Sequence, residues 1–163
     1  MAGMRITGFV AGPFQTNCYV VANGDRAIVI DPGLGAHDVV ARLADEKGFT
    51  VDAVVLTHGH IDHIRDAAAF GVETFVHPAD AFMLLRGDGV SEQARELHDA
   101  SGMQPIDNPT PLADGQVLTV AGLPGTLWNC LPLELRAGDG PVGAGSGSGC
   151  PRRPAAARLG AQA

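Results

Sequence analysis

The chain has 163 residues, of which 45% are hydrophobic and 18% charged, and its net charge is −7 at pH 7. This length and composition suit one soluble globular domain, for which a small-molecule substrate remains open, and they exclude a protein that is disordered throughout. The negative charge argues against a nucleic-acid partner, and the lack of a membrane-length apolar run or a basic leader predicts a cytoplasmic protein without a membrane partner.

The first elements predicted along the chain are β-strands. Residues 4–10 and 17–22 are rich in β-forming side chains, and the turn sequence at 23–26 leads into a strand that ends at Pro32 and Gly33. Strands joined by such short connections are typical of an antiparallel meander.

A helix and further strands follow this meander. Residues 36–47 carry apolar side chains at helical spacing, and Gly48 ends the predicted helix. Residues 52–57 form a nearly continuous apolar run, which predicts a strand buried on both faces. The alternation of strands and helices predicts an α/β layered domain. The remaining predicted elements are a helix near 63–70, a strand at 73–77 and a helix at 78–85.

The composition changes after residue 122. Residues 1–122 carry a net charge of −9, whereas residues 123–163 carry +2 and are dominated by Gly, Pro, Ala and Arg. No strand or helix period is sustained in the second stretch. We therefore predict a domain over 1–122 and an aberrant or disordered tail over 123–163.

The three cysteines are Cys18, Cys130 and Cys150. They are odd in number, far apart and without CxxC spacing. This pattern favours reduced thiols over a disulfide framework or a structural zinc site.

The stretch THGHIDH, residues 57–63, concentrates histidine and aspartate directly after the predicted buried strand. Neutral imidazole and carboxylate are the usual ligands of zinc. Gly59 leaves the backbone free to turn, so that the two flanking histidines can converge on one ion. The aspartate and histidine that enter the next helix can serve a second ion. The candidate metal ligands are therefore His58, His60, Asp62 and His63.

Four other polar residues have competing interpretations. We expect His37 and His98 to be surface histidines that hydrogen-bond to water. His77 follows a strand and could approach the site, but a structural role is favoured. Arg65 either contacts an anionic group of a substrate or, as favoured here, faces solvent.

The motif and two segments upstream of it resemble a known family. THGHIDH resembles the HxHxDH motif of the metallo-β-lactamase superfamily, and NCYVV at 17–21 with VIDPG at 29–33 resembles its glyoxalase II-like hydrolases. The resemblance covers about residues 1–122. It implies an αββα sandwich, of which only the N-terminal half would be complete in this chain.

The resemblance also implies residue roles. Two zinc ions, with iron or manganese as alternatives, would hold a water and deliver hydroxide to the carbonyl of a thioester or ester. Asp62 would orient this nucleophile and would therefore be catalytic as well as a ligand. Asp31 would support the site or only form a turn. The implied ligands are His58 and His60 for the first metal, and Asp62 and His63 for the second.

The chain departs from the family pattern after residue 122. Family members have a third histidine, a bridging aspartate and a last histidine, whereas no histidine follows His98. Thr126 stands where the third histidine is expected, and Asp139 resembles the bridging aspartate without a predicted strand before it. We hypothesise that the tail is a truncated or frame-shifted gene product, since GC-rich DNA read out of frame yields Gly, Ala, Pro and Arg.

These departures leave other functions open. A catalytic zinc keeps three protein ligands, so a chain with two donors per metal could be an inactive remnant with half a metal site. A mononuclear iron dioxygenase that acts on a persulfide and a nuclease are further members of the superfamily, and the acidic charge counts against the nuclease. Half a sandwich would also leave one sheet face uncovered, which predicts instability or aggregation. The oligomeric state is left open.

Overall fold

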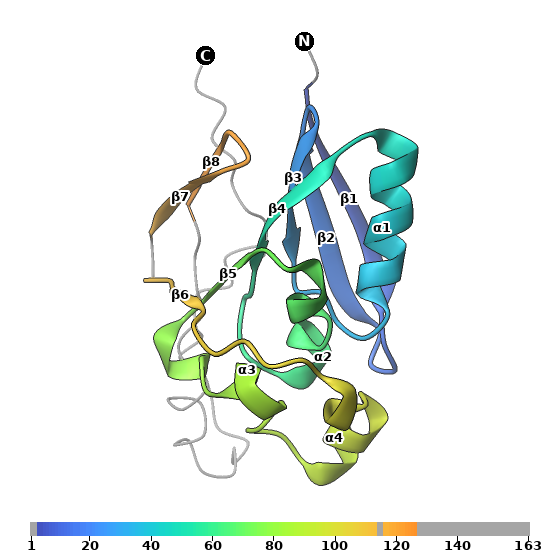
Figure 1. Cartoon of the computed structure of the whole chain (residues 1–163), viewed down its shortest axis with the longest axis vertical. Helices are drawn as coiled ribbons and strands as arrows, with labels where there is room; N and C mark the ends of the chain where they lie inside the picture. The colour runs from blue at the N-terminus through green and yellow to red at the C-terminus, as the bar shows by residue number, and fades with distance from the viewer. Residues whose placement is uncertain (1–2, 114–115, 127–163) are drawn as a thin grey trace, which may run out of the picture.

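The computed structural model describes residues 3–113 and 116–126, and its centre is a mixed β-sheet (Figure 1). β1, β2 and β3 pair antiparallel, which confirms the predicted meander. β3 to β6 pair parallel, so a crossover connects each strand of this part to the next. In sheet order, the strands are β1 (Met4–Ala11), β2 (Thr16–Asn23), β3 (Arg26–Ile30), β4 (Thr50–Val55), β5 (Glu73–Val76) and β6 (Thr110–Pro111).

Helices fill the connections between the parallel strands. The predicted helix at 36–47 is found with the same bounds, because Gly48 takes a left-handed φ of +67° and its amide closes the last turn on the Ala44 carbonyl at 2.8 Å. The helices predicted near 63–70 and at 78–85 are each divided into two short helices. In the part of the chain that the structure describes, no helix is long and apolar enough to cross a membrane. The helices are α1 (Ala36–Lys47), α2 (Ile61–Ile64), η1 (Ala67–Phe70), η2 (Pro78–Asp80), α3 (Met83–Arg86), α4 (Glu92–Leu97) and η3 (Ala100–Gly102).

The main hydrophobic core lies between one face of the sheet and the helices. Strand residues such as Val20, Val29 and Val76 meet helix residues such as Val40 and Ile61 in a single buried cluster. Figure 1 shows α1 running alongside the antiparallel strands, with α2 near the end of β4. The helices therefore form one layer over the sheet.

β4 is buried on both faces, as its apolar run predicts. Val54 and Leu56, at and just beyond its end, belong to the main core, whereas Ala53 and Val55 belong to a second apolar cluster on the opposite face. A strand covered on both sides is typical of a layered α/β domain.

A second, two-stranded sheet covers part of that opposite face. It pairs β7 (Val117–Val120) with β8 (Leu123–Thr126), and Leu118 and Val120 pack on the second cluster. β8 begins after the predicted end of the domain, so regular pairing continues past the change in composition. Residues 127–163, which make up the rest of the predicted tail, lie outside the described residues.

In the described part of the chain, the same face is left exposed beside β1 and β2. Ile6 and Val10 lie two residues on either side of Gly8 and so share its face, and an ideal Cβ on Gly8 would lie 3.0 Å from the Tyr19 ring. Tyr19 is paired with Ile30, which packs on the second cluster. Ile6 is 56% exposed, Val10 58% and Tyr19 41%. Within residues 3–113 and 116–126, this edge of the sheet therefore keeps an exposed apolar face.

Candidate metal centre

His58 and His60 lie on the loop that follows β4, at the carboxyl end of the parallel strands. The backbone of Gly59 passes so close to η2 and α3 that a Cβ there would lie 2.7 Å from Met83 Sδ and 2.9 Å from the Asp80 carbonyl oxygen. Glycine fits this position because it has no side chain. The turn brings His58 Nε2 within 3.0 Å of His60 Nδ1, so the two rings meet, and their convergence on one ion stays a prediction.

The buried side chain of Asp80 also contacts this loop. Its Oδ2 accepts a hydrogen bond from the Gly59 amide at 3.2 Å. Asp80 lies in η2, 21 residues further along the chain, and no local sequence pattern pointed to it. The turn between the two histidines is thus held by a carboxylate from a different element.

Thr57 orients the ring of His58. The Thr57 hydroxyl donates to Asp31 Oδ2 at 2.6 Å and lies 3.1 Å from His58 Nδ1. Because the hydroxyl proton goes to the carboxylate, we assign the proton of the second contact to His58 Nδ1, which leaves the Nε2 lone pair facing His60. Burial, together with the nearby His63 and His60, lowers the pKa of His58 to about 4, so its ring is neutral at pH 7.

Asp62 lies in α2 and is held by Thr16, the first residue of β2. The Thr16 hydroxyl donates to Asp62 Oδ2 at 2.6 Å, and His63 Nε2 lies 3.4 Å from the same oxygen. Burial alone would raise the pKa of Asp62, but the hydrogen bond from Thr16 and the charge of His63 outweigh it and lower that pKa. The carboxylate is therefore ionised at neutral pH. Thr16 is 46 residues away in sequence, and no motif pointed to it.

His63 contacts Asp31 on the opposite side of its ring. Its buried Nδ1 lies 3.0 Å from Asp31 Oδ2, an ion-pair distance without the alignment of a hydrogen bond. Burial by itself would lower the pKa of His63, but the Asp31 carboxylate outweighs it and raises that pKa. Asp31 is buried, with a φ of +53°, and also accepts the Thr57 amide at 2.8 Å. The interpretation of Asp31 as a turn former only is therefore wrong.

The turn after β3 packs directly against α2. A Cβ on Gly33 would overlap the Asp62 carbonyl oxygen, so only glycine allows this approach. The Asp66 amide donates to the Pro32 carbonyl at 3.0 Å and joins the same two segments. The VIDPG segment therefore supplies Asp31, and its Pro32 and Gly33 make the backbone contacts that hold α2 in place.

The four predicted ligands form two neighbouring pairs of donors, His58 with His60 and Asp62 with His63. Among residues 3–113 and 116–126, no three His, Cys, Asp or Glu side chains converge as a preformed metal site. The 3.0 Å between the His58 and His60 nitrogens is nevertheless close to the roughly 3.3 Å expected for two nitrogens on one tetrahedral zinc. A neutral His58 and an ionised Asp62 are also the protonation states that metal ligands need. The residues present thus fit metal binding as two partial sites.

The remaining histidines are not part of this cluster. His77 caps η2, and its Nδ1 accepts the Ala79 amide at 3.2 Å, which confirms the structural interpretation. His37 is partly exposed, in keeping with a surface position. His98 is fully buried, with Nδ1 2.9 Å from the Ala94 carbonyl oxygen, so the prediction of a surface histidine is wrong for it.

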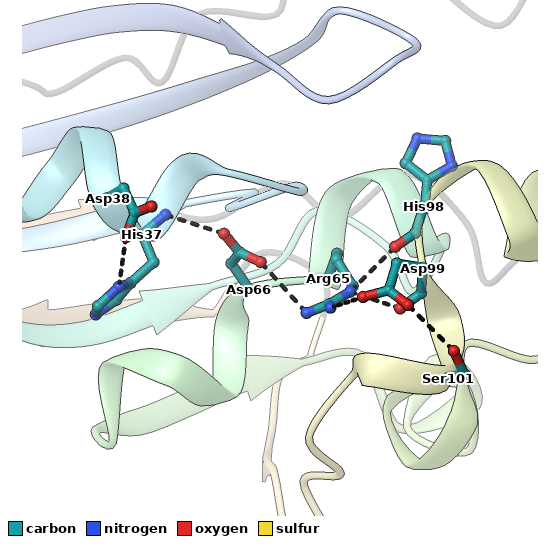
Figure 2. Close-up of polar contacts among 7 residues, drawn as sticks. All are labelled: His37, Asp38, Arg65, Asp66, His98, Asp99 and Ser101. Atoms are coloured by element: carbon teal, nitrogen blue, oxygen red, sulfur yellow. Dashed lines mark hydrogen bonds and ion pairs between the residues drawn. The ribbon is translucent and has the colours of Figure 1, made fainter.

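The prediction that Arg65 faces solvent is also wrong. The side chain is 13% exposed, and its guanidinium is bound to the protein itself. Figure 2 shows that it donates to the carbonyl groups of His98 and Asp99 and pairs with the Asp99 carboxylate. Arg65 therefore links the end of α2 to the segment between α4 and η3.

Sequence comparisons relate the chain to known proteins. The family model described as the metallo-beta-lactamase superfamily matches residues 11–148. An uncharacterized protein of Mycobacterium tuberculosis is 52% identical over 87 residues, which are 50% of this chain and 39% of that protein. A hydroxyacylglutathione hydrolase of Xanthomonas campestris is 42% identical over 65 residues, which are 40% of this chain and 25% of that protein. The chain thus spans less than half of the length of these curated relatives.

Solved structures share the fold. BLEG-1 B3 metallo-beta-lactamase has a TM-score of 0.60 at 26% identity, covering 75% of this chain and 59% of that chain. TTHA1623, solved in a di-iron-bound form, has a TM-score of 0.53 at 28% identity, covering 69% of this chain and 56% of that chain. The chain belongs to the metallo-beta-lactamase superfamily. Its sheet and helices match those of its structural neighbours, which confirms the predicted α/β fold.

Proposed function

We propose that this chain carries the site of a metal-dependent hydrolase that cleaves a thioester or ester of a small molecule. One observation carries the proposal. The rings of His58 and His60 meet at 3.0 Å, and the ring of His63 lies beside them with its centroid 4.1 Å from that of His58. An ionised Asp62 completes the cluster. Donors of these types, gathered at the carboxyl end of parallel strands, are typical of a catalytic metal site.

In this proposal, each pair of donors holds one cation. His58 and His60 bind the first, and Asp62 and His63 bind the second. Zinc is the first choice because imidazole and carboxylate are its usual ligands, and the di-iron form of TTHA1623 supports iron as an alternative, with manganese as a third. Bound cations supply Lewis-acid chemistry, since they polarise a carbonyl group and make water nucleophilic near neutral pH.

The surrounding residues orient this chemistry. Thr16 fixes one oxygen of Asp62, and the lowered pKa keeps the carboxylate ionised, so that it can accept a hydrogen bond from the attacking water and align it. Asp31 contacts His63 on the ring nitrogen that faces away from Asp62. Carboxylates in that position fix the direction of a metal-binding imidazole.

A thioester is the favoured substrate class. The support is the 42% identity to a hydroxyacylglutathione hydrolase over 65 residues. The relative's name describes hydrolysis of an acyl group carried by glutathione. We therefore infer that an acyl-glutathione thioester is the first substrate to assay.

A chain that keeps half a site and turns nothing over is the second candidate. A specific observation favours it: no three suitable donors converge within the described ranges, whereas a catalytic zinc keeps three protein ligands. The third candidate, a mononuclear iron dioxygenase acting on a persulfide, would be identified by one iron per chain and by oxygen consumption.

Metal content per chain separates these candidates. Zinc, iron and manganese would be measured by mass spectrometry on protein purified without a histidine tag. The variants are His58→Ala and the matched control His77→Ala, whose ring caps η2. We expect about two equivalents of metal in the wild type and the control, about one in His58→Ala, and thioester hydrolysis only in the first two. A wild-type chain without metal would instead establish the inactive half-site.

A further inference from the structure

The guanidinium of Arg65 joins two segments that are far apart in sequence. Arg65 directly follows α2, and its amide closes that helix on the Ile61 carbonyl at 3.0 Å. Its Nε donates to the carbonyl oxygens of His98 and Asp99 at 3.0 and 2.9 Å. Its Nη2 donates to Asp99 Oδ2 at 2.8 Å, and its Nη1 lies 3.5 Å from Asp66 Oδ1 (Figure 2). One side chain thus connects the end of α2 to the start of η3.

The segment that receives Arg65 is itself well fixed. Asp99 has a left-handed φ of +49°, and its carbonyl oxygen also accepts the Gly102 amide at 3.1 Å. Its second carboxylate oxygen accepts the Ser101 hydroxyl at 3.1 Å. The His98 amide donates to the Ala94 carbonyl at 3.2 Å, which ties the segment to α4. Arg65 is therefore bound to a defined backbone shape rather than to a loose loop.

This segment also packs on the β1–β2 loop, which leads into Thr16. The fully buried ring of His98 meets the ring of Phe14 edge-on, with centroids 4.6 Å apart, and Phe14 lies two residues before Thr16. Thr16 in turn donates to Asp62 in α2. The contacts close a ring of segments. Arg65 joins α2 to the His98–Asp99 segment, the His98 ring joins that segment to Phe14 in the β1–β2 loop, and Thr16 at the start of β2 joins back to α2.

α2 depends on such contacts because it has only four residues. A helix of this length is not stable by itself in water. The direction of the Asp62 and His63 side chains is therefore set by whatever holds the two ends of α2. Thr16 acts on the Asp62 side chain, and Arg65 acts on the backbone beyond His63.

We propose that Arg65 is a positioning residue that fixes α2, and with it Asp62 and His63, against the His98–Asp99 backbone. The assignment of Asp62 and His63 as ligands of the second cation rests on the proposed function. The fixing of α2 does not depend on metal. His58 and His60 precede α2, and the turn between them is bound by Asp80, so we infer that Arg65 affects one cation and spares the other.

The test compares Arg65→Met and Arg65→Lys with the control Arg42→Met in the full chain. Arg42 lies on the exposed side of α1, so the control makes the same chemical change away from the site. In metal-free protein, we expect amide hydrogen exchange of residues 61–66 to rise about tenfold in Arg65→Met and to stay unchanged in the control. Lysine keeps the charge but lacks the planar fork, so Arg65→Lys should restore only part of the protection.

Metal binding is then measured by chelator competition with zinc. We expect the affinity for one equivalent to fall about 10- to 100-fold in Arg65→Met and the affinity for the other to be retained. A lower unfolding temperature, with exchange of residues 61–66 and both zinc affinities unchanged, would overturn the proposal and leave Arg65 a general stabilising residue. If the wild type binds no zinc, the proposed function fails, and the exchange of residues 61–66 still decides whether Arg65 fixes α2.

Discussion

Gly33 lies where the turn after β3 passes closest to α2. A Cβ at this position would overlap the Asp62 carbonyl oxygen, which is backbone and cannot rotate away. We expect Gly33→Ala to push the turn from α2 and to lower the free energy of unfolding by about 1–3 kcal/mol, as overpacking does. Urea unfolding would measure this change. Gly3→Ala is the control, because a Cβ there has open space, and equal midpoints for the two variants would contradict the prediction.

Cys18 gives a pH dependence whose sign follows from burial. Burial, with added repulsion from Asp31 and Asp66, raises the pKa of the Cys18 thiol from 9.0 to about 12. Between these values the unfolded chain releases a proton that the folded chain keeps, so stability should fall as the pH rises above about 9. Urea midpoints at pH 8 and 10 would measure the loss. Cys18→Ala should lose less between the two pH values, and equal losses would show that Cys18 is not responsible.

At the scale of single residues, the candidate site was predictable where its members are close in sequence. The candidate metal ligands within residues 57–63 can be identified from their spacing and residue types. Thr16 and Asp80 could not be found in this way, because only the fold brings them to Asp62 and Gly59. The burial of His98 gave no signal either, since a lone histidine looks the same in sequence whether it is inside or outside.

α4 (Glu92–Leu97) is capped by the residue that precedes it. It has six residues, and the Ser91 hydroxyl caps it by accepting the Ala94 amide at 3.2 Å. We expect Ser91→Ala to lower the free energy of unfolding by about 1 kcal/mol, measured by urea unfolding. Ser101→Ala is the control, because its hydroxyl makes a single exposed contact with Asp99, and it should change stability by less than about 0.5 kcal/mol. A Ser91 variant as stable as the control would contradict the role of this cap.

The bounds of a helix or strand were predictable when its own sequence defines where it begins and ends. α1 was predicted at its observed bounds because a helical apolar pattern meets a terminal glycine. α2 and α3 have four residues each, and their bounds are set by packing against the sheet and by side chains from elsewhere. β8 could not be predicted, because LPGT has little strand character and forms a strand only by pairing with β7.

The apolar surface beside β1 and β2 leads us to expect self-association of the whole molecule. Ile6 and Val10 are more than half exposed on an edge strand, a surface that favours self-association. We expect Ile6→Thr with Val10→Thr to increase the monomer fraction in sedimentation velocity. The free energy of unfolding should change by less than about 1 kcal/mol, because the side chains are already in water. A wild-type chain that is monomeric and unfolds cooperatively would contradict this prediction.

The layered α/β fold was predictable from the order of strands and helices and from the doubly buried β4. The exposed face beside β1 and β2 agrees with the expectation from the resemblance, in which half of a sandwich would lack its partner layer. The partial cover by β7 and β8 was not predictable, since Leu118 and Val120 pack on a cluster that includes Ala53 and Val55, more than sixty residues earlier in the chain.

The switch from antiparallel to parallel pairing at β3 has a consequence for the order of assembly. β1, β2 and β3 close short loops and can form as soon as they leave the ribosome, whereas β4 pairs with β3 only after the twelve-residue α1 has crossed the sheet. The contacts that complete the site span 26 residues between Thr57 and Asp31 and 46 between Asp62 and Thr16. We therefore expect Asp31 and Thr16 to reach the four donors late in folding, so that a cation would bind a frame that is already built rather than nucleate it.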